Sequence, residues 1–245
     1  MVLENHSFSE VAGHSPYLNA LARDCGLATD YTAITHPSLP NYLALTSGGT
    51  DGVTSDCTSC TVQASSLFGQ LGGDWRSYLQ ALPSQGYRGA FSGAYAKKHN
   101  PAAYYTRVAD YARDALPLGA LPGGLSRGSL ARFNLIVPDL CDDEHDCSVD
   151  TGDRWLQAWM PRILRSQAYR NGRTALFVTY DEGSGGDNRV YTVVVAPSVR
   201  RGTVSAEPFD HYSLLRTIER MLGLPCLAAA CRASSMAAPF HLLAP

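Results

Sequence analysis

No run of apolar residues in this sequence is long enough to cross a membrane as a helix, so the sequence gives no sign of integral membrane contact. It also lacks an excess of either charge. The 245 residues carry a formal net charge of −2, which excludes bulk attraction for nucleic acid or for an anionic membrane. Charged residues make up 17% of the chain and hydrophobic residues 45%, a balance that excludes disorder and suits one α/β domain.

The start of the chain lacks the basic region and apolar core of a secretory signal. Only Met1, Val2 and Leu3 precede the first polar residues, whereas a buried strand ordinarily has about five or six residues. We therefore expect a missing segment, and a secreted or cell-envelope protein whose signal is absent from this chain. A cytoplasmic protein that never had a signal is the alternative.

A second C-x-x-C motif is also absent, so the C-T-S-C string does not indicate a four-cysteine zinc site, and no thioredoxin-like pattern surrounds it. Six of the seven cysteines instead fall into short-range pairs, which are typical of disulfides in an oxidising compartment. The predicted disulfides are Cys57–Cys60, Cys141–Cys147 and Cys226–Cys231. Cys25 is left over.

Residues 36–49, HPSLPNYLALTSGG, place a hydroxyl where a helix begins. The two prolines fit an extended approach and a first helical turn, and residues 41–47 can continue the helix until the Gly-Gly pair ends it. The backbone N–H groups and the dipole at this helix start favour an anion such as phosphate. Ser38 is therefore a candidate nucleophile, although a helix N-cap would also explain an isolated serine here.

Polar side chains follow two predicted strands. Glu4 and Asn5 come directly after the first three residues, and Asp181 and Glu182 follow an apolar, β-rich run. Ligands of open parallel sheets bind beyond the carboxyl ends of the strands, so these side chains can meet Ser38 in one crevice. Carboxylate, amide and serine oxygens together suit a divalent cation, whereas an isolated Asp-Glu pair would more simply be a solvated turn.

Three histidines are candidates for contacting a phosphate ester, because histidine can donate a proton or hold an anion near neutral pH. His145 lies in an acidic loop directly after the predicted strand 133–137. His211 precedes a predicted helix over 212–222, and His36 lies two residues before the candidate nucleophile. The alternatives are an acidic loop held by a disulfide for His145 and an ordinary helix-terminal residue for His211.

Five motifs follow one another in the order seen in a known family: LENHSF at 3–8, HPSLPNYLALTSG at 36–48, VPDLCDDEHDC at 137–147, TYDEG at 179–183 and HYSLLRTIE at 211–219. Through them nearly the whole chain resembles the bacterial phosphoesterases that include acid phosphatases and the phospholipase C group, within the alkaline phosphatase superfamily. The S-L-P-N string is also similar to the T-F-P-N nucleophile segment of nucleotide pyrophosphatases.

The resemblance implies one phosphoesterase domain over residues 1–245, folded as a three-layer α/β sandwich with a mostly parallel central sheet. It implies Ser38 as the nucleophile and Asn41 as an amide that contacts the transition state. It also implies one divalent metal ion, Ca, Mg, Mn or Zn, held by Glu4, Asn5, Ser38, Asp181 and Glu182. Glu182 stands where some relatives have a second Asp, which bears on the choice of cation.

The function that follows is metal-dependent hydrolysis of a small-molecule or lipid phosphate ester through a phosphoserine intermediate. The compact size favours a phosphomonoesterase of the acid phosphatase kind. Three alternatives stay open: a phospholipase C-type phosphodiesterase, a sulfatase on the same scaffold, and a noncatalytic protein that holds an anion.

Between the motifs, hydrophobic periodicity predicts further elements. Helices are expected over 16–25, 65–72, 75–82 and 151–165, and strands over 87–91 and 190–196. Residues 92–128 are expected to be irregular and to form a lid or insertion beside the site, where basic and aromatic residues can grip an organic phosphate. A surface excursion with ordinary aromatic packing is the alternative. Trp155 and Trp159 are predicted core residues, with substrate stacking as the alternative.

Overall fold

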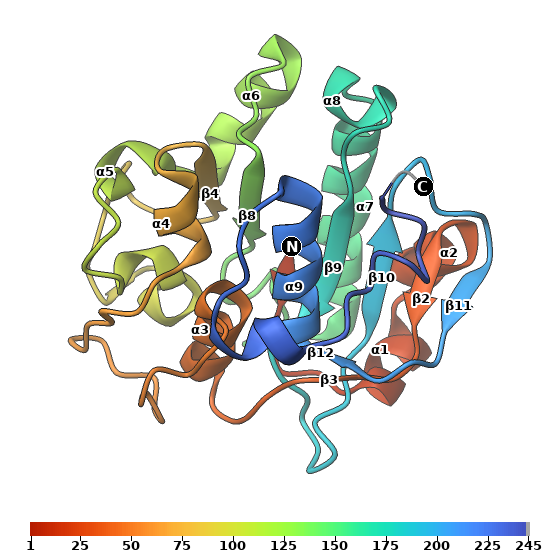
Figure 1. The fold of residues 1–245 in the computed structure, drawn as a ribbon, viewed down its shortest axis with the longest axis horizontal. Helices are drawn as coiled ribbons and strands as arrows, with labels where there is room; N and C mark the ends of the chain where they lie inside the picture. The colour runs from red at the N-terminus through yellow and green to blue at the C-terminus, as the bar shows by residue number, and fades with distance from the viewer. Residues whose placement is uncertain (244–245) are drawn as a thin grey trace.

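The strands of the chain form two main sheets, which the computed structural model describes within residues 1–243 (Figure 1). The larger sheet has the order β1 (Val2–Leu3), β9 (Leu176–Tyr180), β10 (Thr192–Val195), β2 (Gly26–Ala28) and β11 (Thr203–Ser205). The smaller sheet has the order β7 (Ala115–Pro117), β4 (Trp75–Leu79) and β8 (Phe133–Val137). Two short pairs join β3 (Tyr31–Thr32) to β12 (Phe209–Asp210) and β5 (Phe91–Ser92) to β6 (Tyr95–Ala96).

Helices cover both faces of the strands. On one face α1 (Phe8–His14) and α2 (Pro16–Asp24) pack against α7 (Val149–Leu164), and on the other α3 (Ser38–Ser47) packs against α9 (His211–Leu222). Figure 1 shows α9 in front of the strands and α7 behind them. The shorter helices are α4 (Leu67–Leu71), α5 (Tyr111–Asp114), α6 (Leu121–Arg127) and α8 (Gln167–Arg170). This arrangement confirms the predicted α/β sandwich.

Most strand pairings are parallel, as predicted, while β10 runs antiparallel to both of its neighbours. In the parallel β1–β9 pair, Leu3 lies opposite Tyr180, so Glu4 and Asp181 leave the sheet at the same edge. The backbone N–H of Glu4 donates to the carbonyl of Asp143 at 2.8 Å, which brings the loop after β8 to this edge as well. The carboxyl ends of three strands therefore surround one position.

The helix α3 begins at Ser38, three residues earlier than the expected start of its helical run, and all ten of its residues are buried. Gly48 ends it as predicted, with a left-handed φ of 79°. A side chain at this position would meet the Leu227 carbonyl, because a Cβ there would lie 2.4 Å from that oxygen. Glycine is therefore required for close packing of the C-terminal segment on α3.

Three predictions about the middle of the chain are wrong. Residues 75–79 form the strand β4 and not a helix, because β4 pairs along its whole length with β8 from far along the chain. The strand expected over 87–91 begins only at Phe91. Residues 92–128 are not irregular. They contribute β7 to the smaller sheet, and they also form the helices α5 and α6.

The same segment supplies buried aromatic residues to the core. Tyr95, Tyr104 and Tyr105 are at most 3% exposed, which supports the alternative of ordinary aromatic packing for them. A lid role for residues 92–128 stays a prediction. The elements expected near 16–25, 65–72, 151–165 and 190–196 are confirmed as α2, α4, α7 and β10.

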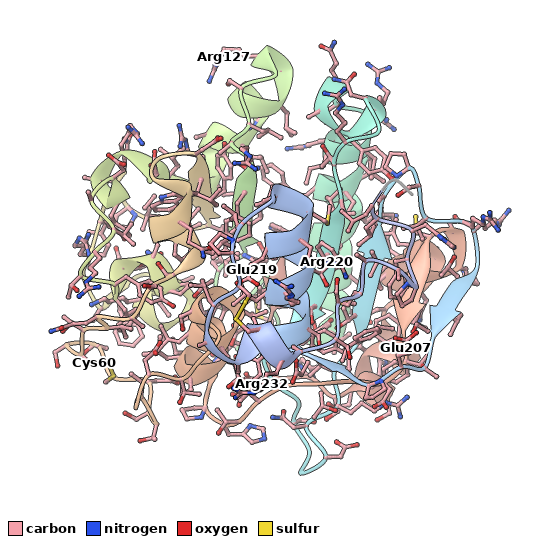
Figure 2. The ribbon with its side chains drawn as sticks, viewed as in Figure 1. Cys60, Arg127, Glu207, Glu219, Arg220 and Arg232 are labelled. Carbon is pink, nitrogen blue, oxygen red and sulfur yellow. A yellow bond between two sulfur atoms is a disulfide. The ribbon has the colours of Figure 1, made fainter. Side chains whose placement is uncertain are left out.

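All three predicted disulfides are present: Cys57–Cys60, Cys141–Cys147 and Cys226–Cys231. Cys25 is free and partly exposed. The segment that holds the third disulfide is tied to α9, because the Glu219 carboxylate accepts a hydrogen bond from the Leu227 N–H at 2.7 Å (Figure 2). None of the helices within residues 1–243 combines the length and the apolar character needed to cross a bilayer. Residues 244–245, the end of the predicted domain, lie outside the described residues.

Candidate active site

The Ser38 hydroxyl lies between two buried carboxylates at the edge where β1 and β9 end. It donates toward Glu4 Oε2 at 3.1 Å and toward Glu182 Oε1 at 3.4 Å. Ser38 is 1% exposed, Glu4 is fully buried and Glu182 is 5% exposed. The structure therefore brings together side chains from three distant parts of the chain, as the strand-end argument predicts.

Asn5 and Asp181 complete this group of oxygens. The Asn5 N–H donates to Asp181 Oδ1 at 3.2 Å, and the Asn5 backbone has a left-handed φ of 54°. Asn5 Oδ1 and Asp181 Oδ2 are buried and have no hydrogen-bond partner within residues 1–243. Buried polar atoms are ordinarily paired, so these two oxygens point to a ligand that accepts their lone pairs.

The electrostatics of the group are unfavourable without such a ligand. Burial raises the pKa of Asp181 well above its usual value, and repulsion from Glu4 and Glu182 raises it further. Burial also raises the pKa of Glu182, an effect that His36 opposes through its hydrogen bond to the Glu182 carboxylate. Carboxylates so arranged need a positive charge among them.

One positive charge comes from His99, which the sequence patterns did not single out as a site residue. His99 Nε2 lies 3.0 Å from Glu4 Oε2, and His99 Nδ1 lies 3.0 Å from Asp143 Oδ2. Burial by itself lowers the pKa of His99, but Glu4 and Asp143 raise it to about 9. His99 is therefore an imidazolium at neutral pH, and it lowers the pKa of Glu4 although burial acts in the opposite direction.

Two sets of ligands for a metal ion overlap at Glu4. Glu4, His99 and Asp143 offer ligand atoms that all lie within 4.8 Å of one another. Both His99 nitrogens face carboxylates in this set, so His99 would have to release a proton before it could bind a metal. Unpartnered buried atoms occur in both sets: Asn5 Oδ1 and Asp181 Oδ2 in the predicted one, His99 Nε2 and Asp143 Oδ2 in the other. The predicted set of Glu4, Asn5, Ser38, Asp181 and Glu182 offers only oxygens, which suits a hard divalent cation.

Lys98 forms the cationic side of the site, with His145 as one of its hydrogen-bond acceptors. Lys98 Nζ lies 3.5 Å from Ser38 Oγ, 3.2 Å from Asp56 Oδ2 and 2.9 Å from His145 Nε2. Because the ammonium can only donate, His145 Nε2 accepts, which leaves the ring proton on Nδ1 to bond Asp146 at 2.7 Å. The structure thus connects the predicted His145 to Ser38 through Lys98, a residue that was expected only as part of a lid.

The predicted site residue His211 lies against the backbone of Asp181. It is fully buried, and burial lowers its pKa to about 4. Its Nε2–H donates to the carbonyl of Asp181 at 2.6 Å, and its Nδ1 accepts from the Tyr31 hydroxyl at 3.0 Å. Both nitrogens are engaged, so His211 holds the backbone of Asp181 in place in this structure; its predicted contact with substrate stays a prediction.

Asn41 is likewise saturated with hydrogen bonds. Its Oδ1 accepts from the N–H groups of Ile34 and Thr35 at 3.0 and 3.1 Å, and its Nδ2 donates to the carbonyls of Thr35 and Pro37 at 2.8 and 3.2 Å. These bonds fix the segment that leads into Ser38. The predicted role of Asn41 as a donor to the transition state stays a prediction, and it requires these bonds to rearrange.

The Glu144 side chain connects the acidic loop that contains His145 to the end of β9. Its carboxyl group accepts from the Tyr180 hydroxyl at 3.0 and 3.1 Å, one residue before Asp181 in the chain. A Cβ at Gly152, in the first turn of α7, would lie 2.0 Å from its Oε1, so only glycine fits there. Burial raises the pKa of Glu144 to about 9, with added repulsion from Asp143.

This pKa predicts a pH-dependent effect of Glu144→Gln. Above pH 4.5 the unfolded wild type releases the Glu144 proton while the folded state keeps it until about pH 9. The wild type therefore loses stability as pH rises through this range, by up to about 1.4 kcal/mol per pH unit. Glutamine does not titrate, so the free energy of unfolding of Glu144→Gln relative to wild type is expected to rise from pH 5 to pH 9.

Urea denaturation across this pH range measures the difference. Glu207→Gln, at an exposed glutamate, controls for the substitution itself (Figure 2). A stability difference between Glu144→Gln and wild type that does not change with pH would show that Glu144 ionises normally in the folded protein.

Comparisons with known proteins identify the family of this chain. The model of the Phosphoesterase family matches residues 11–225. A phosphatidylinositol-3-phosphatase from Mycobacterium tuberculosis (strain ATCC 25618 / H37Rv) is 33% identical over 237 residues, which cover 92% of this chain and 76% of that protein. A phosphate-repressible acid phosphatase from Penicillium chrysogenum is 31% identical over 242 residues, covering 92% of this chain but only 58% of the fungal protein.

Solved structures show the same fold at low identity. A phosphonate monoester hydrolase from Silicibacter pomeroyi superposes with a TM-score of 0.66 and 12% identity, covering 100% of this chain and 76% of that one. A protein of the alkaline phosphatase superfamily from Vibrio parahaemolyticus gives a TM-score of 0.64 with 10% identity, covering 94% and 68%. At these identities the likeness concerns the fold alone.

Proposed function

Because the chain belongs to the phosphoesterase family, we propose that it hydrolyses phosphate monoesters with Ser38 as the nucleophile. The observation that carries this proposal is the position of the Ser38 hydroxyl, at the start of α3, between two buried carboxylates and beside the Lys98 ammonium. Acceptors for the serine proton and a cation for the phosphoryl charge thus all lie within 3.5 Å of one oxygen.

Each residue around Ser38 has a separate role in the proposed reaction. Ser38 Oγ attacks phosphorus and gives its proton to Glu4 or Glu182, the two carboxylates toward which its hydroxyl points. Lys98 stabilises the phosphoryl oxygens. The Lys98–His145 pair supplies a proton to the departing alcohol, and water then releases phosphate from the serine.

A divalent cation fits the same group of side chains, as the unpartnered Asn5 and Asp181 oxygens indicate. The residues that would hold it are Glu4, Asn5, Ser38, Asp181 and Glu182. When bound, a cation of this kind supplies positive charge that favours the serine alkoxide and offsets charge on the phosphoryl group. The ligands are all oxygens, which suits Ca, Mg or Mn and also permits Zn.

Monoesters are preferred over diesters because the two relatives named above are a phosphatidylinositol-3-phosphatase and an acid phosphatase, whose names both denote phosphate removal. A lipid or small-molecule phosphate ester is thus the proposed substrate class. The three disulfides suit an oxidising compartment, and we infer that the protein works outside the cytoplasm.

A panel of p-nitrophenyl esters tests the reaction class. The wild-type protein, chelated and then supplied with single divalent cations, is expected to hydrolyse the monophosphate at least about tenfold faster than the phenylphosphonate, the bis-phosphodiester or the sulfate. Faster turnover of the diester would favour the phospholipase C-type alternative. Turnover of the sulfate alone would reject the proposal, and binding of phosphate without any turnover would favour the noncatalytic alternative.

A further inference from the structure

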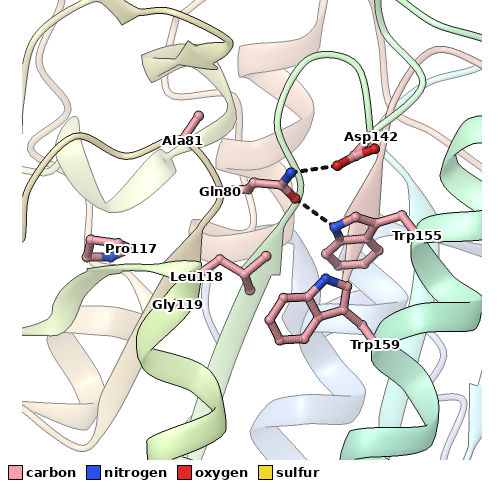
Figure 3. Close-up of a pocket in the computed structure, with 8 residues that line it drawn as sticks. All are labelled: Gln80, Ala81, Pro117, Leu118, Gly119, Asp142, Trp155 and Trp159. Atoms are coloured by element: carbon pink, nitrogen blue, oxygen red, sulfur yellow. Dashed lines mark hydrogen bonds between the residues drawn. The ribbon is translucent and has the colours of Figure 1, made fainter.

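A cavity of about 330 Å³ opens beside the acidic loop, and Ser38 does not line it (Figure 3). It is lined by the indoles of Trp155 and Trp159 on α7, by Gln80 after β4, by Asp142 of the acidic loop, and by Leu118. We call it the tryptophan pocket. None of the residues that hold or surround Ser38 lines it, so the proposed hydrolysis does not account for it.

Gln80 fixes the polar wall of the tryptophan pocket. Its Oε1 accepts from the Trp155 indole N–H at 2.6 Å, and its Nε2 donates to Asp142 Oδ2 at 2.5 Å (Figure 3). The same Nε2 also donates to Asp139 Oδ2 at 3.0 Å. The amide donors of Gln80 are therefore all used. This wall can therefore accept hydrogen bonds from a ligand, through Asp142 and the second lone pair of Gln80 Oε1.

The charge of the tryptophan pocket is negative. Of the eight residues that line it, Asp142 alone carries a charge, and its Oδ1 has no hydrogen-bond partner among the described residues. Such a wall repels phosphate and other anions. The two indoles, with ring centroids 5.9 Å apart, add electron-rich surfaces that attract cations. The Arg162 guanidinium already lies 4.8 Å from the centroid of the Trp159 ring, which shows that this indole receives a cation.

We propose that the tryptophan pocket is a binding site for a small organic ammonium ion, separate from the phosphoesterase centre. An ammonium group donates hydrogen bonds and accepts none, which matches a wall of acceptors. A sugar, the other ligand that stacks on tryptophan, needs donors as well, and of the lining side chains Trp159 alone has one to spare, its indole N–H. The ammonium pairs with Asp142 while its alkyl groups contact Trp155, Trp159 and Leu118.

Binding is tested by NMR with protein labelled at the tryptophan indoles and three probes of matched length: n-butylammonium, n-butanol and butyrate. Butylammonium is expected to shift the Trp155 and Trp159 resonances saturably, with a dissociation constant on the order of 1 mM, and butanol and butyrate to bind at least about tenfold more weakly. The indole of Trp75, which is buried at the other end of β4, serves as an internal control and should not move.

Two variants assign the ligand contacts. Asp142→Asn is expected to weaken butylammonium binding at least about tenfold, whereas Asp150→Asn, at an exposed aspartate on α7, leaves it unchanged. Arg162→Gln, which removes the competing cation from Trp159, should strengthen it. An unshifted Trp75 resonance shows that each variant is folded.

Three outcomes overturn the proposal: no saturable shift of either pocket indole at 100-fold the expected dissociation constant, equal binding of butanol and butylammonium, or equal binding by Asp142→Asn and wild type in a folded variant. Because the readout is binding at Trp155 and Trp159, none of these results depends on whether the protein hydrolyses phosphate esters.

Discussion

Ser38→Ala is expected to lower kcat for p-nitrophenyl phosphate at least about 10⁴-fold, because it removes the atom that bonds to phosphorus. The fold should survive the change. Ser38 lies in the first turn of α3, and its hydroxyl contacts only side chains of the site. The substitution therefore removes the reacting oxygen with little effect on packing.

Ser47→Ala is the matched control. Ser47 is buried at the other end of the same helix and bonds the Leu43 carbonyl and Asp51. This variant is expected to lose about 1 kcal/mol of stability and to keep kcat within about threefold of wild type. If Ser38→Ala kept more than a tenth of wild-type kcat while remaining folded, the nucleophile would have to be another group.

Removing divalent cations is expected to lower kcat by about 10³-fold, since several kcal/mol of charge stabilisation are lost. Adding back one suitable cation should restore the rate and raise the melting temperature, because binding to the folded state relieves repulsion among Glu4, Asp181 and Glu182. Activity assays and thermal unfolding, before and after chelation, measure both effects.

Two substitutions decide which oxygens hold the cation. Asp181→Asn should abolish the cation-dependent rise in melting temperature, whereas Asp187→Asn, at an exposed aspartate of the same loop, should not. His99→Gln should keep the rise, because His99 lies outside the proposed ligand set of Glu4, Asn5, Ser38, Asp181 and Glu182. The reverse pattern would assign the cation to Glu4, His99 and Asp143.

The positions of Glu4, Asp181 and Ser38 could be predicted because strand ends and helix starts are recognised from neighbouring residues. Glu4 and Asp181 each follow a buried strand by one residue, and parallel pairing of β1 with β9 brings the two strand ends together. Ser38 starts a helix whose glycine stop is visible in the sequence. Strand ends and helix starts are read from neighbouring residues alone, so these predictions needed no knowledge of the rest of the fold.

What the sequence did not predict depends on partners far along the chain. Lys98 and His99 lie in the short helix Lys97–His99, which reaches the site only because it packs against α3. The strand β4 was mistaken for a helix because its pairing with β8 is invisible in the local pattern. His211 and Asn41 were expected to face substrate, since nothing in the sequence shows that their polar atoms are already paired with Tyr31, Asp181 and the backbone before Ser38.

Trapping the phosphorylated enzyme tests the central claim most directly. Wild-type protein with its activating cation is mixed with p-nitrophenyl phosphate, quenched in acid within milliseconds, and digested for mass spectrometry. We predict that the peptide containing Ser38 gains the mass of one phosphoryl group, that fragmentation places it on Ser38, and that Ser38→Ala shows no such peptide. Full turnover with the phosphoryl group on another residue, or with none on the protein at any quench time, would contradict the account.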